Sequence, residues 1–245
     1  MTVELDSIDP ALVEMSHQFS AATAAGVLLR RGIRNSYMTG LKPLFAAAAE
    51  MRVFGRARTL SFLPMREDQT VPRERRHEAP HVRAFQSMEP GDVLVCDQRG
   101  VVTAGGLGNV VATYLKRKGV VGIICDGALR DSTRQAKVGL PVYALGVHGA
   151  SGVKEIWPVA YDVPVACGGC LVMPGDYILA DGEGVVVIPR MLATEVVEAC
   201  LEQEISEEYA LDALARGEDL AGIYPPIGQY VADYEAFKAR RAKER

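Results

Sequence analysis

From residue 92 to residue 131 the chain has the order apolar strand, glycine turn, helix, apolar strand, and this order restricts it to an α/β fold. Residues 93–96 and 100–103 are extended pieces before the turn Gly105-Gly106-Leu107-Gly108. Residues 110–118 have helical character, and residues 120–125 form a continuous apolar strand. We therefore expect residues 126–131 to be a loop at the carboxyl end of a strand, where α/β folds place ligands.

The residues before this core are expected to be mainly helical. Alanine and leucine predominate over residues 9–50, and the pattern is broken at Gly32 and Gly40. This predicts two or three helices, the first of them capped near Ser7 or Asp9.

The other elements are predicted from apolar runs between turns. The charged, proline-marked residues 65–81 are expected to form a surface loop. Apolar spacing typical of a helix continues beyond residue 191 until Pro225-Pro226 ends it. The predicted strands are residues 52–63, 142–145, 163–167, 170–172, 177–180 and 185–188, and the predicted tail helices are residues 191–216 and 231–240.

The composition is that of an ordinary globular protein. The 245 residues can bury a sizeable core, and 31 acidic against 27 basic residues give a net charge of −4, which does not favour nucleic acid. No apolar run approaches the roughly 18 residues of a membrane span, and the first residues lack the pattern of a secretion signal. Five cysteines, mostly in apolar context, indicate reduced thiols. We therefore expect a soluble, cytoplasmic protein without a nucleic-acid or membrane partner.

Two features of the core predict a site for an anion and a metal ion. The glycine turn opens a helix, and the free N–H groups at a helix start bind carboxylates or phosphates. Arg130 could supply a cation for the same anion, and Asp131 an oxygen ligand for a divalent metal. From the pattern alone, Arg130 and Asp131 could equally form a salt bridge in a surface loop.

Other motifs compete for the chemistry. Gly106 and Gly108 match two glycines of a dinucleotide fingerprint, but Val111 occupies the third position. Cys167-Gly168-Gly169-Cys170 has the spacing of a redox or zinc pair, yet no second pair exists, so a glycine-bent strand is the better interpretation. Among four scattered histidines, His81 is the candidate substrate contact because it lies beside the basic loop.

Four segments follow one another in an order that is specific. Gly-Gly-Leu-Gly-Asn and a helix precede Gly-Val-Val-Gly-Ile-Ile-Cys-Asp-Gly-Ala-Leu-Arg-Asp-Ser, then come Val-Pro-Val-Ala-Cys-Gly-Gly and Val-Met-Pro-Gly-Asp-Tyr-Ile-Leu-Ala-Asp-Gly-Glu-Gly-Val-Val-Val-Ile-Pro. In this order the chain resembles the RraA-like family from about Gly26 to Pro226. That family unites the RNase E activity regulator A proteins with the 4-hydroxy-4-methyl-2-oxoglutarate aldolases, which are class II pyruvate aldolases.

The resemblance implies a fold and an assembly. The fold is an α/β sandwich of the β-β-α swivelling type with helical N-terminal and C-terminal extensions. It would form one RraA-like domain over residues 1–245, with a core at about 26–190 and a helical tail at 191–245. The family implies a homotrimer or homohexamer with the site at a subunit interface.

The resemblance also implies roles for the residues of the core motif. In the aldolases, amides of the glycine turn and an arginine bind the pyruvyl carboxylate, and the next aspartate binds a divalent metal. By position the amides are those around Gly106, Leu107 and Gly108, the arginine is Arg130 and the metal ligand is Asp131.

Three further positions complete the predicted site. The family places a glutamate from the neighbouring chain's C-terminal helix near the metal, where Glu208 is the best match and Glu207 the next. Asn109 stands where the aldolases commonly have aspartate. This difference removes a charge from the outer shell of the metal, so the affinity for the metal or the basicity of its water changes.

The predicted function is metal-dependent cleavage of a C–C bond in a 2-oxo acid. Mg²⁺ or Mn²⁺ on Asp131 would chelate the 2-oxo acid while Arg130 clamps its carboxylate, which favours retro-aldol release of pyruvate or β-decarboxylation of oxaloacetate. A metal-bound water, oriented by Asn109 and an acid of the adjacent chain, would carry the proton. The alternative is a non-catalytic regulator that binds an RNA-processing enzyme.

Overall fold

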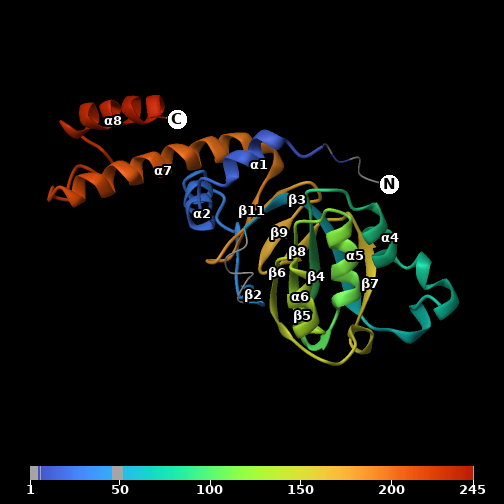
Figure 1. The fold of residues 1–245 in the computed structure, drawn as a ribbon. Coiled ribbons are helices and arrows are strands. Elements are labelled where there is room, and N and C mark those ends of the chain that lie inside the picture. The colour runs from blue at the N-terminus through green and yellow to red at the C-terminus, as the bar shows by residue number, and fades with distance from the viewer. Residues whose placement is uncertain (1–4, 6, 46–51, 245) are drawn as a thin grey trace.

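A computed structural model describes residues 5, 7–45 and 52–244, and it shows a central sheet with helices around it (Figure 1). In this part of the chain the main sheet has the strand order β1-β11-β10-β3-β4-β5-β6-β2, and β7 pairs with the second half of β3. Strands β3 to β6 run parallel to one another. The strands are β1 (Tyr37–Met38), β2 (Lys42–Pro43), β3 (Val53–Pro64), β4 (Asp92–Gly105), β5 (Gly122–Leu129), β6 (Val142–Val147), β7 (Ile156–Tyr161), β10 (Tyr177–Ala180) and β11 (Val185–Ile188).

Each face of this sheet is covered by a different layer. Along β4, Val93 and Val95 pack toward the small hairpin of β8 (Val165–Cys167) and β9 (Cys170–Val172). The alternate residues Leu94 and Cys96 pack toward helices, since successive side chains of a strand point to opposite faces. Those helices are α4 (Pro80–Ser87), α5 (Asn109–Arg117) and α6 (Ser132–Val138). The three layers confirm the predicted β-β-α sandwich.

The predicted helical extensions are present, and they lie at one edge of the sheet. The helices α1 (Pro10–Ser16), α2 (Ala21–Arg30) and the first half of α7 (Ala193–Ala215) pack on β10 and β11. The Asp9 carboxylate accepts a hydrogen bond from the Ala11 N–H at 2.8 Å, which confirms the predicted cap of the first helix.

The last part of the chain extends away from the sheet (Figure 1). It consists of the second half of α7, a connection and α8 (Tyr230–Glu244), and we call residues 205–244 the C-terminal arm. The arm has a small core of its own around Tyr209, Ala213, Ile223 and Tyr234. Within the described residues, no helix is both long enough and apolar enough to cross a membrane.

Some predicted elements are wrong. Residues 126–129 are not a loop, because β5 continues to Leu129 and only the next two residues leave the sheet. Residues 65–81 are not a plain loop either: they contain 3-10 turns at Glu67–Gln69 and Arg73–Glu78 and the start of α4, so His81 is helical. Two helices form between residues 9 and 45, which agrees with the predicted two or three, and residues 46–51 lie outside the described part.

The cysteine prediction is confirmed. All five cysteines are free and buried. Cys167 and Cys170 pair across the β8–β9 hairpin, whose turn consists of Gly168 and Gly169 at φ 54° and 81°. This left-handed backbone favours glycine, so the Cys-Gly-Gly-Cys motif is explained by the turn.

Candidate active site

The two predicted motifs meet because β4 and β5 are parallel neighbours. The glycine turn follows the end of β4, and Arg130 follows the end of β5, with Gly105 in register with Ala128. The carboxyl ends of parallel strands lie at the same edge of a sheet, so the turn and Arg130 are placed side by side. The Arg130 N–H donates to the Leu107 carbonyl at 2.9 Å, which joins the two segments directly.

A buried glutamine stabilises this junction. The Gln135 side chain on α6 donates from Nε2 to the Arg130 carbonyl at 2.7 Å and to the Leu107 carbonyl at 3.1 Å. It is 1% exposed, so these bonds form where water does not compete. No pattern in the sequence predicts this role, because Gln135 appears there only as one polar residue of a short helix.

The start of α5 presents free N–H donors. Gly108 is the N-cap residue, and no side chain caps the helix. The Gly106 N–H is donated to the Ala128 carbonyl at 3.0 Å, which removes it as a free donor. Among the described residues, no acceptor contacts the N–H groups of Leu107 and Gly108, and the first-turn N–H groups of a helix have no partner within the helix. The positive end of the helix dipole therefore faces an open position.

The Asp131 carboxylate reaches the glycine turn through an unusual backbone. Asp131 has φ 58° and ψ 34°, a left-handed conformation that aspartate tolerates better than most residues. Its side chain makes no cap bond to α6 and lies against Gly108 instead, where an added Cβ would stand 2.5 Å from Oδ2. Asp131 Oδ2 also lies 3.2 Å from Arg130 Nε, and both side chains are partly exposed.

Around these groups is an open cavity of about 210 Å³. The glycine turn, the Arg130–Asp131 pair and the Ser151–Val153 segment line it. Its volume suits a small organic acid, since a water molecule's share of liquid volume is about 30 Å³. The predicted anion-binding and metal-binding groups therefore share one cavity, although the ion pair of the alternative interpretation is present as well.

The donor set fits a hard divalent ion that keeps other oxygen ligands. The described residues contain no group of three or more His, Cys, Asp and Glu side chains that could hold a metal. A structural zinc site needs four such ligands, whereas Mg²⁺ is commonly bound by one or two carboxylates with water and substrate oxygens. Asp131, uncapped and beside a glycine that leaves it room, fits the second arrangement.

The remaining predicted residues lie in three places. Asn109 is the first residue of α5, directly after Gly108, and is not among the residues that line the cavity. His81 lines a second cavity that also contacts Gly106. Glu207 and Glu208 lie on the C-terminal arm, where Glu207 accepts from the Tyr224 hydroxyl and Glu208 pairs with Arg241. Within one chain the two glutamates are therefore apart from Arg130 (Figure 1).

Comparison with known proteins decides the family. The Aldolase/RraA profile, described as RraA-like, matches residues 15–187. The chain belongs to this family. That match contains the whole cavity described above and ends before α7 begins.

Relatives in the family carry several names. A protein of Halalkalibacterium halodurans named "Putative 4-hydroxy-4-methyl-2-oxoglutarate aldolase" is 32% identical over 127 residues, which cover 52% of this chain and 60% of that protein. A protein of the same name from Burkholderia mallei is 32% identical over 60% of this chain and 82% of its own length. Protein DlpA of Legionella pneumophila is 27% identical over 89% of this chain, but the match spans only 34% of DlpA.

Solved structures of the family agree with the fold. RraAS2 of Streptomyces coelicolor, described as an unusual member of the RNase ES inhibitor RraA protein family, is 38% identical with a TM-score of 0.76. The alignment covers 84% of this chain and 98% of RraAS2. An uncharacterized Pseudomonas syringae protein, 22% identical with a TM-score of 0.75 over 89% of this chain and 99% of that one, supports the fold alone. The family thus includes proteins named as aldolases and proteins described as RNase inhibitors.

Proposed function

We propose that this protein is a divalent-metal-dependent lyase that cleaves a C–C bond of 2-oxo acids and releases pyruvate. The observation that carries the proposal is that Arg130, Asp131 and the uncapped start of α5 surround one cavity. A salt bridge that served only stability would not require Gly108 to leave space beside the Asp131 carboxylate. The names of the relatives support a lyase.

The substrate carboxylate is held by donors of this chain. The N–H groups of Leu107 and Gly108 have no acceptor among the described residues, Gly108 lines the cavity, and the Arg130 guanidinium can bind a carboxylate through two parallel hydrogen bonds. This arrangement fixes the 2-oxo group at the side of Asp131. Asp131 would hold Mg²⁺ or Mn²⁺, and the ion, when bound, supplies a Lewis acid that stabilises negative charge on the 2-oxo oxygen.

The bond changes balance without any other reactant. In retro-aldol cleavage, the C4 hydroxyl gives its proton to water, C4 becomes a carbonyl as the C3–C4 bond breaks, and the electron pair passes to C3 and the 2-oxo oxygen. C3 then takes a proton from water, and pyruvate forms. In oxaloacetate, CO₂ leaves from C3 instead. Asn109, at the start of α5, would orient the water that exchanges these protons.

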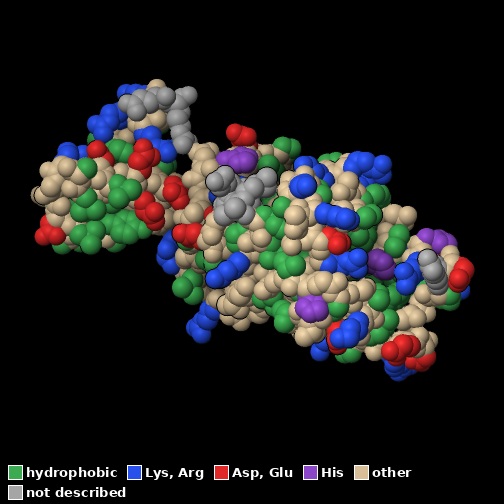
Figure 2. Space-filling model, turned by 60° about the horizontal axis from the view of Figure 1, so that its bottom comes forward, with side chains coloured by type: hydrophobic (Ala, Val, Ile, Leu, Met, Phe, Trp, Pro, Cys, Tyr) green, Lys and Arg blue, Asp and Glu red, His purple; other side chains and the backbone are tan. Residues whose placement is uncertain are grey.

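The C-terminal arm supports a homotrimer or homohexamer as the working unit. Its surface exposes Leu211, Leu220 and Ile227 at 68%, 55% and 61%. Figure 2 shows hydrophobic side chains gathered on the arm, at the left of the view. Contiguous exposed apolar surface is typical of an interface. A second copy that covers this face would bring Glu207 or Glu208 toward a neighbouring site.

An assay of pyruvate release tests the proposal. Purified protein is incubated with 4-hydroxy-2-oxo acids and with oxaloacetate, and pyruvate is measured by a coupled dehydrogenase, with Mg²⁺, with Mn²⁺ and with EDTA. We expect EDTA to abolish release and Asp131→Ala to lower kcat/KM by about 100-fold or more. The control is Asp68→Ala. Asp68 forms an exposed ion pair with Arg66, so this variant should retain activity. Full metal-dependent release by Asp131→Ala would refute the proposal.

A second candidate function is inhibition of an RNA-processing enzyme. The observation in its favour is the 38% identity to RraAS2 over almost the whole length of that protein. It requires a protein surface and no metal, so Asp131→Ala should bind such an enzyme as the unchanged protein does. Surface plasmon resonance with an RNase E-type enzyme, in the presence of EDTA, distinguishes this candidate from the lyase.

A further inference from the structure

A second cavity, of about 60 Å³, adjoins the candidate active site. The two cavities share Gly106, Gly152 and Val153 as common walls. Gly106 and Gly152 are in such close contact that a Cβ on Gly152 would stand 2.8 Å from the Gly106 Cα. The second cavity therefore borders the cavity to which we assign the 2-oxo acid, with these two glycines between them.

His81 is the titratable residue among those that line this second cavity. Its ring makes edge contacts with Phe85 and Trp157, at centroid distances of 5.8 and 6.0 Å. Its Nδ1 atom is buried and has no hydrogen-bond partner among the described residues. Burial lowers the pKa of His81, and the nearby charge of Arg76 lowers it further, so the ring is neutral at neutral pH. A buried ring nitrogen without a partner is costly unless a ligand or water meets it.

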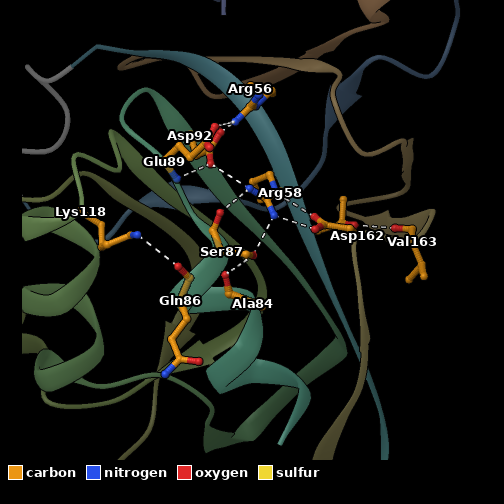
Figure 3. A network of polar contacts seen from close by, with 11 residues as sticks. Arg56, Arg58, Ala84, Gln86, Ser87, Glu89, Asp92, Lys118, Asp162 and Val163 are labelled. Carbon is orange, nitrogen blue, oxygen red and sulfur yellow. Dashed lines mark hydrogen bonds and ion pairs between the residues drawn. The ribbon is translucent and has the colours of Figure 1, made fainter. Parts of the chain in front are cut away.

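Helix α4 holds His81 in a fixed position. At the far end of the helix, Arg58 on β3 donates to the Ser87 carbonyl at 2.9 Å and to the Ser87 hydroxyl at 2.8 Å (Figure 3). Lys118 donates to the Gln86 carbonyl at 3.1 Å. Cations at the last carbonyls stabilise a helix end. The His81 ring is thus preorganised against the cavity, which reduces the cost of ordering it on binding.

The second cavity has no charged wall. The residues that line it, all within the described part of the chain, include no Lys, Arg, Asp or Glu. Two arginines of the preceding segment have their own partners at the surface: Arg66 pairs with Asp68 and Arg75 with Glu78. A carboxylate that entered the cavity would lose its water without meeting a cation in the wall, which is unfavourable.

We propose that the second cavity binds the uncharged end of the substrate, and that the substrate class is 4-hydroxy-2-oxo acids with a methyl or ethyl group at C4. This inference rests on the proposed function. The alkyl group contacts Phe62 and Trp157, and the C4 hydroxyl oxygen accepts a hydrogen bond from the neutral His81 ring, which leaves the hydroxyl proton free to pass to water. The volume admits about two carbon-sized groups, given about 30 Å³ for a water. The products are pyruvate and a short aldehyde. The proposed substrate differs from the one in the relatives' name, which carries a carboxylate at C4.

A substrate pair tests the inference. Wild-type protein with Mg²⁺ is given 4-hydroxy-2-oxopentanoate, which has a C4 methyl group, and 4-hydroxy-2-oxoglutarate, which has a C4 carboxylate. We expect kcat/KM to be at least about tenfold higher for the methyl compound. A preference for the carboxylate compound would overturn the inference and leave the proposed function intact.

Variants of His81 separate substrate recognition from stability. His81→Phe keeps the apolar contacts and removes the hydrogen bond, so kcat/KM for the methyl compound should fall by about 3- to 10-fold. Inhibition by pyruvate, which does not reach His81, should be unchanged. His81→Arg adds a cation and should shift the preference toward the carboxylate compound. The control Arg83→Ala changes an exposed residue of the same helix and should behave as wild type.

The outcomes against the inference are distinct from failure of the lyase function. If both His81 variants change kcat/KM for all substrates and inhibition by pyruvate to the same extent, His81 is only structural and the inference fails. If no compound yields pyruvate with either metal, the lyase proposal fails, and calorimetric titration with 2-oxopentanoate and 2-oxoglutarate then tests the cavity. Tighter binding of 2-oxopentanoate by wild type supports the neutral cavity, and tighter binding of 2-oxoglutarate overturns it.

Discussion

At the scale of single residues, the candidate site depends on a glycine that lets a carboxylate approach. Gly108 has φ −124°, which any residue adopts, so its backbone does not require glycine. What requires it is the space beside it: a Cβ would stand 2.5 Å from Asp131 Oδ2 and 3.4 Å from the Arg130 side chain. Glycine is thus needed at position 108 for the space that it leaves beside Asp131, and not for its backbone conformation.

We expect Gly108→Ala to fold and to lose activity. The added methyl group displaces the Asp131 carboxylate, so pyruvate release should fall by about tenfold or more, since small misplacements of a reacting group are costly. The control is Gly146→Ala, because nothing lies within 4 Å of a Cβ at Gly146. Circular dichroism should show both variants folded. Equal activity of the two variants would contradict this account.

A half-buried carboxylate away from the site makes stability depend on pH. Burial raises the pKa of the Asp126 carboxyl and the nearby Asp97 charge adds to this, against hydrogen bonds from the N–H groups of Gly168 and Gly100. Ionisation of Asp126 therefore costs the folded state more than the unfolded state, where the pKa is about 3.9. This cost is present at neutral pH and disappears as pH falls below that value.

We accordingly expect Asp126→Asn to raise the melting temperature at pH 7. The advantage should shrink steadily as pH falls toward 4, because Asp126 takes up its proton in the folded state before it does so in the unfolded state. Thermal unfolding followed by circular dichroism between pH 4 and 8 measures this. A gain that stays constant over that range would mean that packing, rather than charge, sets the difference.

At the scale of elements, a buried ion-pair network joins α4 to the sheet (Figure 3). Arg56 and Arg58 lie two residues apart on β3 and both donate to Asp92, at 2.8 and 3.2 Å. Arg58 also makes two bonds with Asp162, at 2.9 and 2.7 Å. Asp92 is fully buried, so its negative charge needs both of these arginine partners.

Removal of one member of this network should lower the stability of the folded protein. Arg58→Met leaves Asp162 unpaired and frees the Ser87 end of α4, so we expect the free energy of unfolding to fall by about 3 kcal/mol. Urea unfolding measures the loss, and hydrogen exchange should increase along α4. The matched control Arg66→Met breaks an exposed pair with Asp68 and should change stability by less than about 1 kcal/mol. Equal losses would disprove the special role of Arg58.

The elements that the sequence predicts best are those with strong turn signals. β10 and β11 have the predicted bounds because Pro-Gly-Asp and Asp-Gly-Glu-Gly delimit two short apolar runs. β7 was not predicted, because Pro158 interrupts its apolar run and only pairing with β3 makes it a strand. The end of β5 was misplaced because Asp126 and Gly127 have the pattern of a turn, while neighbouring strands hold them in the sheet.

The sequence predicted the chemistry of the side chains in the candidate site, but not the contacts that position them. Arg130 and Asp131 follow from charge and position, and parallel strands explain why they meet the glycine turn. The buried clamp by Gln135 and the second cavity around His81 depend on contacts between segments far apart in the chain. Local patterns do not encode such contacts, so only the structure reveals them.

At the scale of the whole molecule, the C-terminal arm exposes an apolar face to solvent. We expect the double variant Leu211→Glu, Ile227→Glu to reduce the particle mass to that of one chain, because charges oppose burial of this face. Light scattering coupled to size exclusion measures the mass. The control Leu29→Glu changes an exposed apolar residue of α2 outside the arm. An unchanged mass for the double variant would show that the arm does not hold copies together.

The same experiment separates two roles of the arm. If a neighbouring copy supplies Glu207 or Glu208 to the site, the monomeric variant should also lose pyruvate release. The single variant Glu208→Gln, which keeps the apolar face, should then lose activity while it keeps its mass.

The boundary between the family-matched residues and the arm has a consequence for how such proteins diversify. The match ends at residue 187, and the helices of the arm pack among themselves, apart from the residues that line the cavity. The residues that line the cavity and the residues of the exposed apolar face thus lie in separate stretches of the polypeptide. Relatives could exchange one stretch and inherit the other intact, so a graft of this tail onto a shorter homologue should transplant quaternary structure without altering substrate choice.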